Sequence, residues 1–359
     1  MLSAQGTLLL RKGTVPTDER QLRALIERGA FVEEEEFQRH QPMPEEQARP
    51  EPPPKPLSGF DQWASIYRRI GVLLRQHRSE PQFVEKLAQL SNEVRTLADH
   101  DIDVAIFAMT RLDRTHYAIA HTLQVALCCD IYARFLRYDE AERSSLVKAA
   151  LTMNLTILEL QNTLSRQEGR PSAEQLEEIR AHPMRARDWL ASAGVTDESW
   201  LRAVAEHHES SDGKGYPLGL SIVFPAAEVI NIADRYCALM SHRRGREALV
   251  SNKAARDLYM LTTGHLQEII ARMIKAFGMF PPGNFVKLAN GETAVVLRRS
   301  EHANKPLVAS LISEVGRKLV DPVLRDTAMA EFNITHVVPE SVMAVQFDRD
   351  QLFELVKQP

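Results

Sequence analysis

The chain has 359 residues, of which 44% are apolar and 26% charged, and its 44 Lys and Arg residues nearly balance 48 Asp and Glu residues, giving a net charge of −4. This length predicts about two domains, and the near-neutral charge argues against a surface devoted to a nucleic acid polymer. The sequence contains no apolar run long enough for a membrane span and no signal-peptide pattern at its start. Three cysteines, two of them adjacent, are too few for a disulfide framework. These features predict a cytoplasmic location.

The first segment, residues 1–36, predicts a small N-terminal α/β unit. A β-like run covers residues 7–10, and an amphipathic helix follows Asp18 and ends near Gly29. Residues 37–57 are rich in Glu and Pro and nearly free of large apolar residues. This composition predicts an extended linker.

Residues 58–300 have a mostly helical pattern. Apolar residues recur at helical spacing from Phe83 to Leu97. Further helices are expected at about 115–136, 143–159, 173–192, 197–208, 225–241, 251–261 and 265–277.

Strand patterns return near the C-terminus. Runs at 285–288 and 293–297 flank Asn290-Gly291, which predicts a β-hairpin. A second pair is expected at 306–319, and β-like runs follow at 332–338 and 342–347. Residues 301–359 are therefore expected to form a β-containing C-terminal extension of a mainly α protein.

The stretch with the most chemical information reads His207-His208-Glu209-Ser210-Ser211-Asp212-Gly213-Lys214-Gly215-Tyr216-Pro217. Two histidines at the end of a helix can both bind a metal as neutral imidazoles, and the glycines allow a sharp turn beside them. His121, His182 and Asp234 lie on other predicted helices. A bundle builds a metal site from such a set, although each residue taken alone is more often an ordinary core or surface residue.

Over about residues 105–300 the sequence resembles the HD-GYP domains, a branch of the HD phosphohydrolase superfamily. The resemblance includes the string from His207 to Pro217, Ile232-Ala233-Asp234, Ser241-His242-Arg243 and Phe280-Pro281-Pro282-Gly283. It implies an HD-domain-like helical bundle that binds two or three metal ions, often iron or manganese. It also implies hydrolysis of cyclic di-GMP to the linear dinucleotide, and often on to GMP, by a metal-bound hydroxide.

The sequence departs from the family at the HD dyad itself. The family helix reads roughly A-A-L-L-H-D-I-G-K, and the matching stretch here is Ala149-Ala150-Leu151-Thr152-Met153-Asn154-Leu155-Thr156-Ile157. Met153 replaces a histidine ligand, Asn154 the metal-bridging aspartate and Ile157 the lysine that assists catalysis. Without a bridging anion, two metal ions would repel each other with nothing between them.

The resemblance assigns the remaining positions as follows. His121 and Asp234 are what is left of one metal position, and His182, His207 and His208 of the other. This leaves a site for one divalent ion of zinc, manganese or iron, or for none. The family's nucleotide contacts fall on Tyr216, Arg243 and Arg246, and the remaining motif residues are Glu209, Asp212, Gly213, Gly215 and Pro217. A solvated basic turn explains Arg243 and Arg246 equally well.

Three functions stay open. The favoured hypothesis is a bacterial signalling protein with a degenerate HD-GYP domain, which has lost hydrolysis and binds cyclic di-GMP or partner proteins. The first alternative is a metal-dependent phosphodiesterase that uses a mononuclear histidine site, with Glu209 or Asp212 transferring a proton. The second is a purely structural interaction module.

Overall fold

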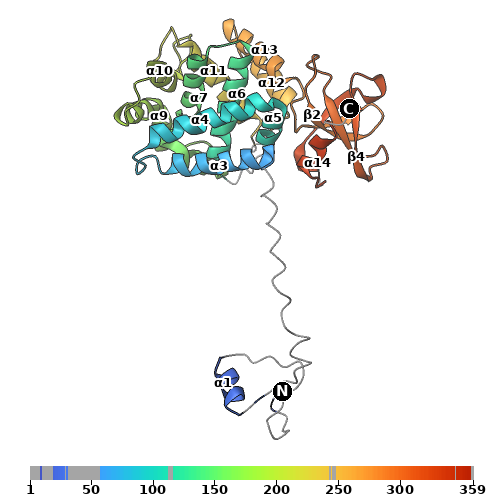
Figure 1. Ribbon diagram of the computed structural model, residues 1–359. Coiled ribbons are helices and arrows are strands. Elements are labelled where there is room, and N and C mark those ends of the chain that lie inside the picture. Colours follow the sequence, from blue (N-terminus) through green and yellow to red (C-terminus); the bar gives the residue numbers. More distant parts are fainter. Residues whose placement is uncertain are drawn as a thin grey trace. The chain divides into compact units, whose positions relative to one another are not determined.

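The computed structural model describes Leu9, residues 19–28, Ala30 and residues 57–111, 116–241, 244, 248–343 and 345–356 (Figure 1). The chain divides into two compact units, Met1–Pro56 and Leu57–Pro359. In the first unit, helix α1 (Glu19–Glu27) lies where the sequence predicts one. The strand expected at 7–10 lies outside the described residues except for Leu9. The linker expected at 37–57 lies outside them except for Leu57.

The second unit is mainly helical, as predicted. Side-chain capping boxes at Ser58, Asp139 and Ser172 begin three of its helices. Among the described residues, no helix is both long and apolar enough to cross a bilayer. The helices are α3 (Gly59–Arg75), α4 (Phe83–His100), α5 (Ile102–Thr110), α6 (Tyr117–Phe135), α7 (Glu140–Thr152), α8 (Leu158–Arg166), α9 (Ala173–Ser192), α10 (Glu198–Glu206), α11 (Pro225–Leu239), α12 (Ser251–Met260) and α13 (His265–Phe277).

Helix α6 is the centre of the bundle (Figure 1). It is buried along nearly its whole length and packs against α7, α11 and α13. A helix that is apolar on all sides must be surrounded by other elements. This position carries His121 into the interior of the protein.

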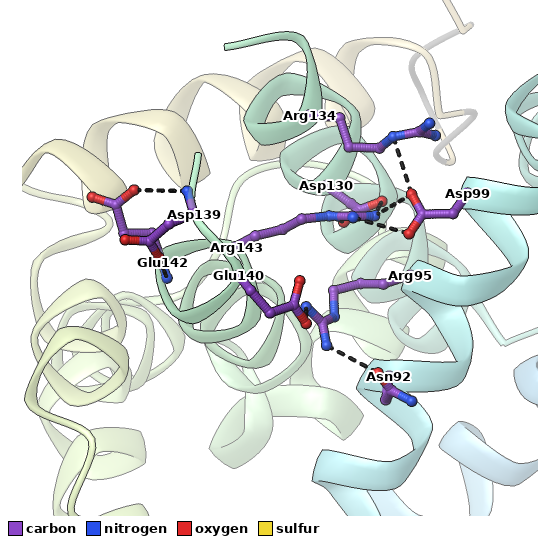
Figure 2. Close-up of polar contacts among 9 residues, drawn as sticks. All are labelled: Asn92, Arg95, Asp99, Asp130, Arg134, Asp139, Glu140, Glu142 and Arg143. Atoms are coloured by element: carbon purple, nitrogen blue, oxygen red, sulfur yellow. Dashed lines mark hydrogen bonds and ion pairs between the residues drawn. The ribbon is translucent and has the colours of Figure 1, made fainter. Parts of the chain in front are cut away.

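An ion-pair network that runs from the exposed Asp99 to the buried Asp130 joins α4, α6 and α7 (Figure 2). Asp130 on α6 is 0% exposed, and Arg143 on α7 donates to its two oxygens at 2.5 and 2.9 Å. Arg143 also donates to both oxygens of Asp99 on α4, at 2.9 and 3.0 Å. Burial raises the pKa of Asp130 above its ordinary value, although Arg143 opposes this rise.

The helix predicted at 143–159 is wrong in its extent. Helix α7 ends at Thr152, a 3-10 turn, η1 (Leu155–Ile157), follows, and α8 is a separate helix. The Thr152 hydroxyl donates to the Lys148 carbonyl and accepts from the Trp200 indole, both at 2.8 Å. Side-chain bonding of this kind competes with the helical ladder. The break therefore falls at Met153 and Asn154, two of the positions that depart from the family pattern.

The C-terminal strands form one antiparallel sheet in the order β4-β3-β2-β1-β5. The hairpin at Asn290-Gly291 is confirmed, with Gly291 at a φ of 88°. The strand expected at 332–338 is present, and a second antiparallel pair forms as expected after residue 306, although its second strand continues to residue 326, beyond the predicted end at 319. Residue 301, where the C-terminal extension is expected to begin, lies between β2 and β3. The strands are β1 (Phe285–Leu288), β2 (Thr293–Arg298), β3 (Leu307–Ile312), β4 (Lys318–Asp326) and β5 (Ile334–Val338), with a 3-10 turn, η2 (Ala330–Phe332), before β5.

The strand predicted at 342–347 is wrong. This segment begins in the 3-10 turn η3 (Glu340–Val342), and helix α14 (Arg349–Glu354) follows it. Phe347 packs edge-on against Phe107 of α5 and Phe285 of β1, with ring centroids 6.4 and 6.1 Å apart. The apolar residues of the segment thus anchor it between helices and sheet, where Figure 1 shows α14 and β2 beside α5.

Candidate metal centre

Three histidines, one from helix α9 and two from the turn after helix α10, converge in the interior. His182 lies on α9, His207 follows the last residue of α10, and His208 comes next in the chain. One ligand atom from each of the three lies within 4.8 Å of the others. His182 and His207 are buried and His208 is half-buried. The sequence motif therefore does bring these three predicted ligands together.

His182 is oriented by the proline that follows it. Pro183 lies inside α9 and has no N–H, so the Ile179 carbonyl lacks its helical donor. The Nδ1 atom of His182 lies 2.5 Å from this carbonyl oxygen and donates to it. The proton is thereby held on Nδ1, so Nε2 is unprotonated and has a lone pair available for a metal ion.

His207 is oriented in the same way by the end of α10. Its Nδ1 donates to the Val204 carbonyl at 2.7 Å, one of the carbonyls left free in the last turn of the helix. The Asn231 side-chain amide on α11 donates to the His207 carbonyl at 2.8 Å. The Nε2 atom of His207 is therefore also unprotonated and has an available lone pair.

The two lone pairs face each other, with the Nε2 atoms of His182 and His207 3.1 Å apart. Two acceptors at this distance repel unless a cation lies between them. Two imidazole nitrogens on one tetrahedral zinc ion lie about 3.3 Å apart, given Zn–N bonds of about 2.05 Å. Burial lowers the pKa of His182 to about 3 and also lowers that of His207. The cluster is thus neutral near pH 7 and fits one divalent ion.

His121 and Asp234 form a separate pair between α6 and α11. The His121 Nε2 lies 2.6 Å from the Asp234 carboxylate and donates to it. The ring of Tyr117 stacks on that of His121, with centroids 5.4 Å apart. Burial by itself raises the pKa of Asp234, but His121, His208 and His207 outweigh burial and hold it below its ordinary value.

The loop after the histidines is held by Glu209. One carboxylate oxygen accepts from the Leu218 amide at 2.5 Å and the other from the Leu220 amide at 2.8 Å. The Cβ of any residue other than glycine at 215 would lie 2.4 Å from the Glu209 Cα. Gly215 is therefore required by a close backbone approach. This loop geometry places the ring of Tyr216 against that of His208, with centroids 4.6 Å apart.

The other motif residues of the loop lie toward its surface. Asp212 is exposed, and its carboxylate accepts from the Lys214 amide at 3.0 Å. Gly213 has a φ of 72°, and the bond from Tyr216 to Pro217 is cis. Glu209 and Asp212 thus both have backbone amides as their hydrogen-bond partners.

The three positions that depart from the family pattern are buried, and the 3-10 turn that ends in Ile157 contacts α9. Met153 is 0% exposed and belongs to the hydrophobic core, Asn154 is 3% exposed and Ile157 is 5% exposed. The residue before Ile157, Thr156, donates through its hydroxyl to the His182 carbonyl at 3.4 Å. This break in the helix is therefore adjacent to the backbone that carries His182.

The nucleotide-binding residues expected at Arg243 and Arg246 lie outside the described residues. Arg244 between them is described, and its guanidinium donates to Glu168 at 2.7 Å. Two contributors to the site are absent from the sequence prediction, Pro183 and Asn231. The dipeptide His182-Pro183 inside a predicted helix is a usable signal for the first, since proline frees a carbonyl. No local pattern identifies Asn231.

Comparisons with known proteins find similarity to HD-domain proteins. A family model described as an HD domain matches residues 102–263. The chain is 28% identical over 171 residues to a 3'3'-cGAMP-specific phosphodiesterase of Vibrio cholerae, covering 47% of this chain and 37% of the relative. It is 24% identical over 199 residues to a cyclic di-GMP phosphodiesterase of Pseudomonas aeruginosa, covering 54% and 48%. The matched regions thus span less than half of either relative. An HDG"Y"P protein from Bdellovibrio bacteriovorus shares the fold, with a TM-score of 0.50, 16% identity and coverage of 62% and 73%.

Proposed function

Because this chain belongs to the HD-GYP family, we propose that it is a signalling protein that binds a cyclic dinucleotide without hydrolysing it. The two curated relatives are named for the hydrolysis of 3'3'-cGAMP and of cyclic di-GMP. Both are cyclic dinucleotides with two phosphodiester groups. The proposed ligand is therefore of this class.

The observation that carries the proposal is the pair Met153 and Asn154 at the break after α7. A thioether is a soft ligand, poorly suited to an ion held by imidazole and carboxylate. An asparagine amide is neutral and cannot offset the charge of two dications about 3.5–4 Å apart. Ile157 adds a buried methyl-bearing side chain where a cation would be needed. A two-metal reaction therefore lacks its bridging anion and its lysine.

The remaining histidines support one metal ion. His182, His207 and His208 would hold it, because the Nε2 lone pairs of His182 and His207 face each other and a ring nitrogen of His208 lies close by. Bound there, a divalent ion supplies a positive charge that attracts a phosphate oxygen. Tyr216 offers an aromatic ring beside His208, and the two arginines expected at 243 and 246 offer planar donors for phosphate.

The groups available for proton transfer argue for binding over hydrolysis. Glu209 uses both of its oxygens to hold the loop, and the Asp212 carboxylate accepts from the Lys214 amide at the surface. A general base needs a free oxygen within hydrogen-bond reach of the attacking water. The three-histidine cluster is the feature of the described residues that favours the mononuclear phosphodiesterase as a second candidate.

Calorimetric titration of the metal-loaded chain with cyclic di-GMP and with 3'3'-cGAMP tests the proposal, together with chromatography of each nucleotide after long incubation. We expect binding with no loss of nucleotide. Arg243→Ala should weaken binding about tenfold or more, as expected for the loss of a charge-assisted phosphate contact. Arg244→Ala is the matched control, because its guanidinium pairs with Glu168.

Two results would overturn the proposal. Metal-dependent hydrolysis that disappears in His207→Ala would establish the mononuclear phosphodiesterase. The second result is that neither nucleotide produces heat on titration, although the chain is folded and metal-loaded. The purely structural interaction module would then be the remaining hypothesis.

A further inference from the structure

The thiols of Cys128 and Cys237 face each other across the interface of α6 and α11. Their Sγ atoms lie 3.5 Å apart, although 109 residues separate them in sequence. None of the three cysteines forms a disulfide bond. We propose that Cys128 and Cys237 are an oxidative modification site, where a peroxide forms a reversible disulfide between the two helices. This proposal does not depend on nucleotide binding.

Both thiols line the same cavity, which gives a small oxidant a place to react. The cavity has a volume of about 410 Å³ and lies between the helices and the C-terminal sheet, lined by α5, α6, α11, β1 and β5 among others. Cys128 is 5% exposed and Cys237 is 1% exposed. Cys129 is also buried but is not among the residues that line this cavity. Both cysteine residues therefore border a space large enough for a molecule as small as hydrogen peroxide.

The chemistry balances with one peroxide per disulfide. The Cys128 thiolate, the more exposed of the two, attacks one peroxide oxygen, the O–O bond breaks, and a sulfenic acid and one water form. The Cys237 thiolate then attacks the sulfenyl sulfur and expels the second water. The two sulfur atoms are oxidised and the peroxide is reduced. The two thiol protons and the peroxide hydrogens leave in the two waters.

The geometry needs only a small movement. A disulfide bond is about 2.05 Å long, so the two sulfur atoms must approach by about 1.5 Å from their present 3.5 Å. The same two helices also carry the His121–Asp234 pair. The disulfide would therefore fix the spacing of the helix pair that carries two of the family's metal-ligand positions.

Intact mass and peptide mapping of the full chain, before and after hydrogen peroxide, test the proposal. We expect the loss of two hydrogen atoms per chain and one linked peptide pair that contains Cys128 and Cys237. Dithiothreitol should reverse the change. Because buried thiols react slowly, the reaction should be followed over hours, with diamide as a second, disulfide-forming oxidant.

Cys129→Ala is the matched control, because it removes the neighbouring cysteine and should leave the disulfide yield unchanged. Cys128→Ser and Cys237→Ser should each abolish it. If a serine variant fails to fold, the control and the wild-type peptide map still decide the question. The proposal is overturned if both oxidants leave the pair reduced in the folded chain. It is also overturned if the mapped disulfide contains Cys129 or joins two chains.

Discussion

The Nδ1 atom of His182 lies 2.5 Å from the carbonyl oxygen of Ile179, the helical acceptor that Pro183 leaves without a donor. One proline thus fixes both the rotation and the protonation of a ligand on α9. The Nε2 atom on the other side of the ring lies 3.1 Å from that of His207. The geometry of the candidate metal centre therefore depends on a residue that has no metal-binding group.

Pro183→Ala should weaken metal binding while it stabilises the helix. The new N–H competes for the Ile179 carbonyl, and loss of such a hydrogen bond to a ligand costs about 10–100-fold in metal affinity. The free energy of unfolding of the metal-free chain should rise by as much as about 3 kcal/mol, because proline disfavours a helix interior. Zinc titration and urea unfolding measure the two effects. Pro171→Ala, before α9, is the control, and equal zinc affinity in both variants would contradict this role of Pro183.

The double variant Met153→His/Asn154→Asp should bind a second metal ion. It restores the imidazole and the bridging carboxylate of the family pattern, in which the matching positions share a metal site with those of His121 and Asp234. Metal analysis after gel filtration measures the number of ions per chain, with Met153→Leu as a control that keeps the core filled. An unchanged metal content in a folded double variant would show that these two substitutions are not what limits the site.

Gly215→Ala should distort the loop that holds Tyr216. The added Cβ would lie 2.3 Å from the Ser210 nitrogen, so the backbone must move. We expect a loss of about 2–3 kcal/mol in the free energy of unfolding, within the range of severe single substitutions. Gly169→Ala is the control. An alanine at this position would be destabilised by about 1–2 kcal/mol by the positive φ of 88°, but its added Cβ would meet no atom within 4 Å. Urea unfolding measures the free energy of unfolding of both variants. Equal losses in the two would argue against a close backbone approach at Gly215.

Arg143→Met should destabilise the bundle by about 3–5 kcal/mol near pH 7, because it leaves Asp130 buried without its partner. A buried acid whose pKa is raised favours the folded state when protonated, so the loss should shrink as the pH falls toward the ordinary value of 3.8. Arg134→Ala, which removes an outer partner of Asp99 (Figure 2), should cost about 1 kcal/mol or less. A pH-independent loss in Arg143→Met would contradict the buried-charge explanation.

Acid should weaken the C-terminal sheet through Glu292. Its oxygens accept from Arg325 at 2.8 and 2.9 Å and from Ser310 at 2.6 Å. The hydrogen bonds from Arg325 are the main cause that lowers its pKa from 4.5 to about 2. The stabilisation is therefore complete above about pH 4.5 and is lost as the pH falls through 2. Urea unfolding of Glu292→Gln should lack this acid-dependent part. If the free energy of unfolding depends on pH equally in the variant and the unchanged protein, groups other than Glu292 cause the acid sensitivity.

Long-range packing explains where the sequence-based prediction of the fold was wrong. The pattern from 143 to 159 is helical throughout, yet Trp200, far along the chain, donates to Thr152 where α7 ends. The run at 342–347 has strand-like residues, but Phe347 packs on Phe107 and Phe285 instead of pairing with a strand. Local spacing carries no information about either contact.

The helical class, the Asn290-Gly291 hairpin and the identity of the candidate histidines could be predicted from the sequence, because period, turn residues and motif spacing are local properties. Which of the predicted ligands lie together is a property of the tertiary structure. It placed the Nε2 atoms of His182 and His207 face to face, paired His121 with Asp234, and committed Glu209 to the loop. Those arrangements depend on the crossing of helices and on free carbonyls at a proline and at a helix end. The same crossing brings Cys128 to Cys237, which no spacing in the sequence indicates.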